Sequence, residues 1–348
     1  MVERLVLKPL RSGPSHVSRL GTGGSTAPAS FRLSVPGGRK HSREPCRPMT
    51  PRVLLFAYSE VGAEALALLL ARDVTVAGLV THAADPDENI WFRPPAALAH
   101  ERGLPVFTPE DVNDPAWIER LRSLQPDLIL SAYYRNLLPP RLLEAARLGA
   151  FNLHGSLLPR YRGRAPVNWA LLHGETRLGL TLHRMVARAD AGPIVDQAAV
   201  EVGPRATAAE AYAALVPLVR ELLGRQLDAL LAGTARETPQ DESRATTFRR
   251  RTAEDGRIDW TQPSARIFNL IRAVTAPYPG AFTDGPGARL LVWWAEPDTP
   301  HTRGRRGAPG EVLAVAPLVV ATGDGALELT RVAWRGQPAA PPAVGQRW

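Results

Sequence analysis

Cysteine is almost absent from this sequence, since Cys46 is the only one among 348 residues. A single thiol excludes a disulfide within the chain and a zinc site built from several cysteines. Proteins of oxidising compartments commonly carry paired cysteines, so this composition is compatible with a reducing compartment. We therefore expect a cytoplasmic protein.

Long apolar runs are also missing. The longest, such as Val53–Ala57 and Leu66–Ala71, fall well short of the roughly 18 residues that a membrane-spanning helix needs. Hydrophobic residues make up 45% of the chain and charged residues 22%, which is ordinary for a globular protein. We expect no membrane partner.

Acidic residues are fewer than basic ones, and the formal net charge is +8. Nine Lys or Arg and two acids lie within residues 1–50, so that segment carries +7 of the total. The remainder of the chain is nearly neutral. Its field gives little reason to expect tRNA or DNA as a partner.

Residues 1–48 lack hydrophobic periodicity and are rich in Gly, Ser, Pro and Arg, which predicts a disordered basic extension. They lack the apolar core of a secretory signal, and their Pro and Gly content argues against the amphipathic helix of a transit peptide. Met49 stands just before the first predicted strand. We hypothesise that Met49 is the true start and that residues 1–48 are a wrongly assigned extension.

From Arg52 onward, short apolar segments alternate with segments of helical composition. Such alternation implies a parallel sheet covered on both faces. The pattern predicts an α/β fold with a Rossmann-like, mostly parallel sheet in residues 49–246. A long helix is predicted over Ala208–Ala232, ending at Gly233. Strands are expected at Val53–Ala57, Val74–Thr81, Pro105–Phe107, Leu128–Ser131 and Ala150–Leu153, and helices at Ala63–Ala71, Ala96–Arg102, Asn113–Ser123 and Arg141–Leu148.

The sequence pattern changes after about residue 247. A helix predicted over Ser264–Val274 leads into several short β-like runs separated by Gly and Pro. This pattern predicts a small β-rich second domain over residues 247–348, and we expect an OB-like β-barrel.

Two polar residues stand at the end of the last strand predicted before the long helix. Asn152 and His154 are two positions apart, so in a strand their side chains share one face. They would lie at the carboxyl edge of the parallel sheet, where ligands bind in such folds. Asp190 offers a carboxylate that could orient the imidazole. Taken singly, an Asn-x-His pair is more often structural, and Asp190 before Ala191 and Gly192 is compatible with a turn.

The full motif carries more information than its parts. It reads Asn-Leu-His-Gly-Ser-Leu-Leu-Pro at 152–159, Arg-Gly-Arg-Ala-Pro-Val-Asn-Trp at 162–169, Thr-Leu-His-Arg-Met-Val at 181–186 and Ala-Asp-Ala-Gly at 189–192. This string resembles the 10-formyltetrahydrofolate-dependent formyltransferases. Residues 133–135, 250–252 and 278–282 add a closer resemblance to the formyltransferase domain of ArnA, which acts on UDP-4-amino-4-deoxy-L-arabinose in lipid A modification. The resemblance spans about residues 51–335.

This resemblance implies roles for the three polar residues. Asn152 would donate a hydrogen bond to the oxyanion of an acyl transfer, His154 would move the proton, and Asp190 would hold the imidazole. It also implies cofactor contacts from Asn136, Leu137, Leu138, Arg164, Val186, Ala187, Arg188, Ala189 and Asp190. Asn136 departs from the family pattern, in which a His is expected. The implied co-substrate is 10-formyltetrahydrofolate, and no metal is required.

The amine acceptor is open between two candidates. The segment after the second strand, residues 82–93, contains three acids and one Arg, which disfavours a tRNA phosphate and favours a nucleotide-linked amino sugar such as UDP-4-amino-4-deoxy-L-arabinose. Residues 254–260, in contrast, resemble methionyl-tRNA formyltransferase. ArnA proper continues into a decarboxylase, so we expect another protein to supply that step, or a different sugar.

Other classes remain as alternatives. A dinucleotide-binding oxidoreductase is disfavoured, because the first βα turn, Tyr58–Glu64, lacks the G-x-G-x-x-G pattern. A non-catalytic folate or nucleotide-sugar binding protein and a formyl-folate hydrolase are further possibilities. The oligomeric state cannot be read from the sequence.

Overall fold

The computed structural model describes residues 50–86, 88–285, 287–338 and 340–348. The predicted disordered extension and the hypothesis about Met49 fall outside these residues. None of the described helices is long and apolar enough to cross a membrane.

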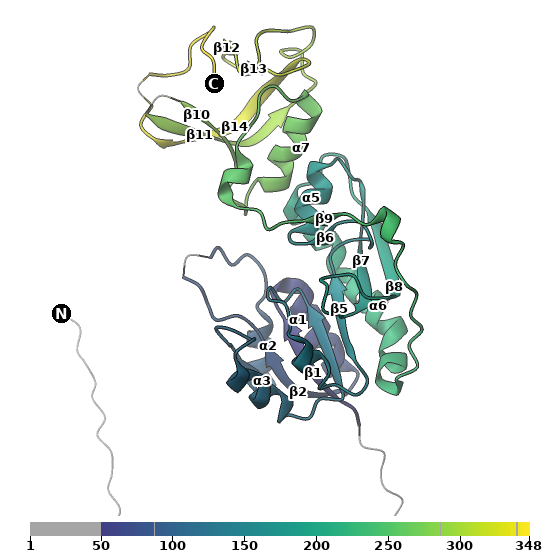
Figure 1. The fold of residues 1–348 in the computed structure, drawn as a ribbon. Coiled ribbons are helices and arrows are strands. Elements are labelled where there is room, and N and C mark those ends of the chain that lie inside the picture. Colours follow the sequence, from purple (N-terminus) through teal and green to yellow (C-terminus); the bar gives the residue numbers. More distant parts are fainter. Residues whose placement is uncertain (1–49, 87, 286, 339) are drawn as a thin grey trace, which may run out of the picture. The chain divides into compact units, whose positions relative to one another are not determined.

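The central sheet has seven strands in the order β3-β2-β1-β4-β5-β7-β8. Figure 1 labels β1, β2, β5, β7 and β8 of this sheet. The five strands from β3 to β5 run parallel, and β7 and β8 add an antiparallel edge. The predicted mostly parallel α/β sheet is confirmed. The strands are β1 (Arg52–Ala57), β2 (Thr75–Val80), β3 (Val106–Phe107), β4 (Leu128–Ala132), β5 (Ala150–His154), β7 (Arg177–Arg184) and β8 (Ile194–Glu201).

Strand β1 shows why both faces of the sheet are covered. Alternate side chains point to opposite faces of a strand. Val53 and Leu55 belong to one apolar cluster, whereas Leu54 and Phe56 belong to another. The first cluster includes residues of α1 and α6, and the second includes residues of α3 and α4. The helices are α1 (Ser59–Ala71), α2 (Pro95–Glu101), α3 (Pro115–Arg122), α4 (Pro140–Leu143), α5 (Pro166–Leu172) and α6 (Ala208–Ala232).

Helix α6 has the predicted bounds because both of its ends carry strong signals. Thr207 and Glu210 form a reciprocal capping box at its start. Gly233 ends it in the left-handed region, with φ of 69°. Helix α4 is shorter than the predicted Arg141–Leu148, since the chain turns after Leu143 to enter β5.

A small parallel pair lies beside the main sheet. Strand β6 (Arg162–Gly163) pairs with β9 (Thr247–Phe248), so two segments about 85 residues apart in sequence run side by side. Short 3-10 helices flank β9 at η1 (Glu242–Arg244) and η2 (Ala253–Gly256).

The C-terminal part consists of helix α7 and a five-stranded antiparallel sheet in the order β10-β11-β14-β13-β12. The expected β-rich character is present, but the expected barrel is not closed: no ladder joins β12 to β10 among the described residues. Instead, Val312 of β12 exchanges backbone hydrogen bonds with Gly345 and Gln346, so the chain end covers this edge. The elements are α7 (Ser264–Val274), β10 (Ala281–Gly285), β11 (Ala288–Glu296), β12 (Val312–Val315), β13 (Leu318–Ala321) and β14 (Ala326–Gly336).

Candidate active site

Strand β5 carries Asn152 and His154 on the same face, at its carboxyl end. The strand pairs with β7 in an antiparallel register that sets Asn152 opposite His183 and His154 opposite Thr181. Directly opposed residues of two strands are close neighbours. The register therefore brings a second histidine to the predicted pair.

His154 is buried, with 7% of its surface exposed. Its Nε2 lies 2.8 Å from the carbonyl oxygen of Tyr161, and its Nδ1 lies 3.5 Å from Oδ1 of Asp190. A carbonyl can only accept, so Nε2 donates to Tyr161 and Nδ1 faces the carboxylate. A proton shuttle at His154 therefore requires one of these contacts to open when substrate binds.

Asp190 lies in the loop between β7 (Arg177–Arg184) and β8 (Ile194–Glu201). Its Oδ2 accepts a hydrogen bond of 2.8 Å from the backbone N–H of Gly163. Burial raises the pKa of Asp190, but His154, His183 and the Gly163 N–H outweigh burial and hold that pKa below its ordinary value. The carboxylate is thus ionised at neutral pH beside the imidazole of His154.

His183 supports the side chain of Asn152. His183 Nδ1 lies 2.9 Å from the carbonyl oxygen of Arg184 and donates to it, so in the neutral ring Nε2 is the acceptor. Asn152 Nδ2 lies 3.2 Å from that Nε2 and donates one N–H to it. The second N–H of Asn152 is then available to a ligand. The separation of 3.6 Å between His183 Nε2 and Asp190 Oδ1 is too long for a hydrogen bond.

Gln240 links the loop that carries Asp190 to the buried side chain of Arg162. Gln240 Nε2 donates to the carbonyl oxygens of Asp190 and Gly192, each at 2.7 Å. Gln240 Oε1 accepts from Nε and Nη2 of Arg162 at 3.1 and 2.7 Å. Arg162 is 1% exposed and also pairs with Glu242 at 2.6 Å. No local sequence pattern indicates this support, because Arg162, Asp190 and Gln240 lie far apart in the chain.

These residues open into a cavity of about 1300 Å³. Asn152, His154 and Asp190 all line it, together with His183. Of the predicted cofactor contacts, Arg188 lies outside the lining and instead pairs with Glu242 at 3.1 Å. The others line the cavity: Asn136, Leu137, Leu138, Arg164, Val186, Ala187, Ala189 and Asp190.

The cavity also has an aromatic and acidic wall. Glu88 accepts from Tyr58 Oη at 2.7 Å and from Arg135 Nη1 at 3.0 Å. His82 Nε2 accepts a hydrogen bond of 3.0 Å from the backbone N–H of Arg135. Burial and the charge of Arg135 lower the pKa of His82 to about 4, so this imidazole is neutral and can accept. Trp91, Phe92, Tyr212 and Tyr278 complete this wall.

Backbone strain is concentrated around the cavity. Seven described residues other than glycine have positive φ, and four of them line the cavity. Tyr161, a fifth, accepts the hydrogen bond from His154. Strained conformations persist where surrounding structure enforces them, commonly at functional sites. The four lining residues are Ser59, Tyr133, Ala165 and Asp190.

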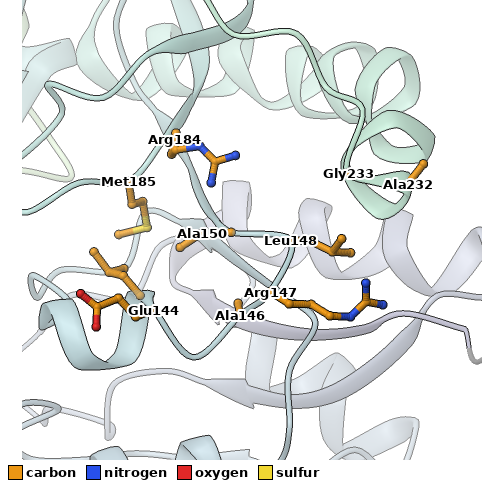
Figure 2. Close-up of a pocket in the computed structure, with 11 residues that line it drawn as sticks. Glu144, Ala146, Arg147, Leu148, Ala150, Arg184, Met185, Ala232 and Gly233 are labelled. Atoms are coloured by element: carbon orange, nitrogen blue, oxygen red, sulfur yellow. The ribbon is translucent and has the colours of Figure 1, made fainter.

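A second cavity of about 550 Å³ lies at the amino end of β5, away from His154. Figure 2 shows Arg184 and Arg147 on two sides of it. Arg184 Nε donates to Glu237 Oε2 at 2.8 Å, and Arg147 pairs with Asp127 at 2.5 Å. Both cations already have acidic partners, so neither arginine of this cavity is left unpaired for an anionic ligand. No group of three or more His, Cys, Asp or Glu gathers as metal ligands within the described part of the chain.

Comparison with known structures supports the same fold. HypX from Aquifex aeolicus, in complex with tetrahydrofolic acid, matches with a TM-score of 0.55 and 22% identity over 81% of this chain, which spans 44% of the HypX chain. An N-formyltransferase from Helicobacter canadensis, in complex with folinic acid and dTDP-3-aminofucose, matches with a TM-score of 0.63 and 16% identity over 81% of this chain and 99% of that chain. Methionyl-tRNA formyltransferase from Clostridium thermocellum matches with a TM-score of 0.51 and 18% identity over 71% of this chain and 93% of that chain.

Two family models match the sequence on either side of the predicted boundary at residues 246 and 247. The model for formyl transferase matches residues 63–225, and the model for the formyl transferase C-terminal domain matches residues 250–344. With both parts matched in order, the chain belongs to the formyl transferase family.

Proposed function

We propose that this protein transfers a formyl group from 10-formyltetrahydrofolate to the amine of a nucleotide-linked amino sugar. One observation carries the proposal: Asn152, His154 and Asp190 converge in a cavity that is also lined by nearly all the predicted folate contacts. An amide donor, an imidazole and a carboxylate are the groups that acyl transfer to an amine needs.

The cavity suits a folate. Leu137 is 61% exposed and Val186 40% exposed, and both line the cavity. Large apolar side chains exposed beside polar groups mark ligand sites. When bound there, 10-formyltetrahydrofolate supplies the formyl group. Arg164 adds a cation to the same region.

Asn152, His154 and Asp190 each have a separate role in formyl transfer. Asn152 points one N–H at His183 and keeps the second for the oxyanion that develops on the formyl oxygen. His154 takes the proton from the attacking nitrogen or returns one to the leaving nitrogen. Asp190, ionised beside Nδ1, stabilises the imidazolium that forms.

The acidic wall supports a sugar acceptor over a tRNA. Glu88 and Asp85 line the cavity from residues 82–93, and Glu60 lines it from the start of α1. Among the described residues, Glu60 and Glu88 already pair with the nearby Arg93 and Arg135, so this wall offers a tRNA phosphate no arginine that lacks an acidic partner. A neutral polyhydroxylated ring suits the aromatic rings there. The solved N-formyltransferase from Helicobacter canadensis holds dTDP-3-aminofucose, which is consistent with this acceptor class.

Within this class we propose UDP-4-amino-4-deoxy-L-arabinose as the acceptor, which would place the protein in lipid A modification and resistance to cationic antibiotics. Methionyl-tRNA is the second candidate, because the Clostridium thermocellum methionyl-tRNA enzyme shares the fold. A non-catalytic binding protein is a third possibility, one that the gathered catalytic residues argue against.

The test offers the full chain 10-formyltetrahydrofolate with each acceptor in turn, following folate product by absorbance and acceptor mass. We expect UDP-4-amino-4-deoxy-L-arabinose to gain one formyl group and methionyl-tRNA to stay unchanged. Formylated tRNA would reverse the acceptor assignment. If neither acceptor changed while both ligands bound, a binding role would replace the catalytic one.

A further inference from the structure

Four arginines line the large cavity: Arg135, Arg164, Arg250 and Arg251. Two of them are already engaged. Arg135 pairs with Glu88 and lies 4.0 Å from the ring centroid of Tyr58. Arg251 lies 4.7 Å from the ring centroid of Trp169 and donates to the carbonyl oxygen of Asp255 at 2.8 Å.

Arg164 and Arg250 are different. Both are exposed, and among the described residues neither side chain has an ion pair or hydrogen bond. The contrast is sharp within the run of residues 249–251. Arg249 Nη1 donates to Asp255 Oδ2 at 2.9 Å, and Arg251 is held as described, so of these three arginines only Arg250 lines the cavity with no side-chain partner among the described residues.

The fold brings these two arginines together. Arg164 follows β6, and Arg250 stands two residues after the end of β9, its parallel partner. The backbone N–H of Arg164 donates to the carbonyl oxygen of Phe248 at 3.0 Å, which fixes the two segments side by side. Burial, and next to it the charge of Arg250, lower the pKa of Arg164. The Asp190 carboxylate offsets part of the repulsion between these guanidinium groups, and a bound anion offsets more of it.

We propose that Arg164 and Arg250 form an anion subsite that binds a phosphate or carboxylate group of a ligand in the cavity. A guanidinium fork binds either group through two parallel hydrogen bonds. The identity of this anionic group rests on the proposed function, which offers two candidates: the diphosphate of the acceptor nucleotide and the glutamate carboxylates of the folate.

The experiment measures binding rather than turnover, with the full chain and isothermal titration calorimetry. The probes are UDP and 5-formyltetrahydrofolate, each titrated into wild type, Arg250→Ala, Arg250→Lys and Arg244→Ala. Arg244 is the matched control, since it is an exposed arginine in the same segment between α6 and α7 and lies outside the cavity lining. Melting temperatures of all variants establish that they are folded.

We expect Arg250→Ala to weaken one of the two probes by about tenfold or more, the scale of a hydrogen-bonded charge pair. Arg250→Lys should recover part of that loss, and Arg244→Ala should bind as wild type does. Raising the salt concentration should weaken binding to wild type more than to Arg250→Ala. A loss for UDP assigns the subsite to nucleotide phosphate, and a loss for 5-formyltetrahydrofolate assigns it to the folate.

Unchanged affinity of Arg250→Ala for both probes would overturn the subsite, and so would the absence of binding of both probes to wild type. These outcomes are distinct from failure of the proposed function. A chain that binds UDP through Arg250 but formylates no amino sugar would retain the subsite and lose the proposed reaction.

Discussion

Asn152 Nδ2 lies 3.2 Å from Nε2 of His183, which accepts in the neutral ring, because the other ring nitrogen donates to a carbonyl. One N–H of the Asn152 side chain is thus bonded within the protein, and the second N–H faces the cavity. This relationship makes His183 a positioning residue for the oxyanion donor.

Replacement of His183 tests this role. In His183→Phe, Asn152 loses its acceptor, and we expect kcat to fall between about tenfold and 10²-fold with little change in KM. His183→Gln keeps an acceptor oxygen and should recover part of kcat. Steady-state kinetics with both substrates measure the split. A rise in KM without a fall in kcat would place His183 in ligand binding instead.

The proton-transfer pair has a larger expected effect. His154→Ala and Asp190→Ala should each lower kcat by about 10²-fold or more, since one removes the shuttle and the other removes the charge that stabilises it. Affinity for 5-formyltetrahydrofolate, measured by calorimetry, controls for damage to the cavity. Wild-type turnover in either variant would refute the assigned role.

The support beneath Asp190 should be visible in stability. Gln240→Ala removes two hydrogen bonds to the Asp190 loop and leaves the buried Arg162 without one acceptor. We expect the free energy of unfolding to fall by about 1–3 kcal/mol, measured by urea denaturation, together with a lower kcat. Gln226→Ala is a control, because the Gln226 side chain donates to Asp196 at 2.9 Å and makes no other hydrogen bond within the described part of the chain. Equal effects of the two variants on kcat would argue against a specific role for Gln240.

His82 predicts a pH dependence of stability. Its pKa is about 4 in the fold against an ordinary 6.5, so the fold favours the neutral ring. The stability this confers is complete above about pH 6.5 and is lost as pH falls towards 4. Protonation also opposes the hydrogen bond from the Arg135 backbone N–H.

The matched variant is His82→Gln, which keeps an acceptor oxygen but does not titrate. Between pH 7 and pH 5, wild type should lose about 1 kcal/mol more stability than this variant, a figure reduced for solvent screening. Urea denaturation at the two pH values measures the difference. Parallel losses in both proteins would contradict the assignment.

Features with a local signal could be predicted from the sequence. Helix α6 is marked by Thr207 at its start and Gly233 after its end, and its bounds agree with the prediction. The two-residue period of a strand correctly placed Asn152 and His154 on one face. Runs of buried apolar residues identified the parallel strands.

Features that depend on distant partners could not be predicted. The role of His183 follows from the register between β5 and β7, which no local pattern encodes. Arg160, Arg162 and Arg164 look alike in sequence, yet Arg162 is buried because Gln240 and Glu242 reach it. The barrel was expected from strand number and spacing, whereas the edge of β12 is instead covered by residues near the chain end.

The most direct test of the central claim uses 10-formyltetrahydrofolate labelled in its formyl carbon, with UDP-4-amino-4-deoxy-L-arabinose as acceptor. Wild-type protein should move the label onto the sugar nitrogen, and His154→Ala should do so at least about 10²-fold more slowly. Label that stays on the folate, or that appears only as free formate, would contradict formyl transfer to an amino sugar.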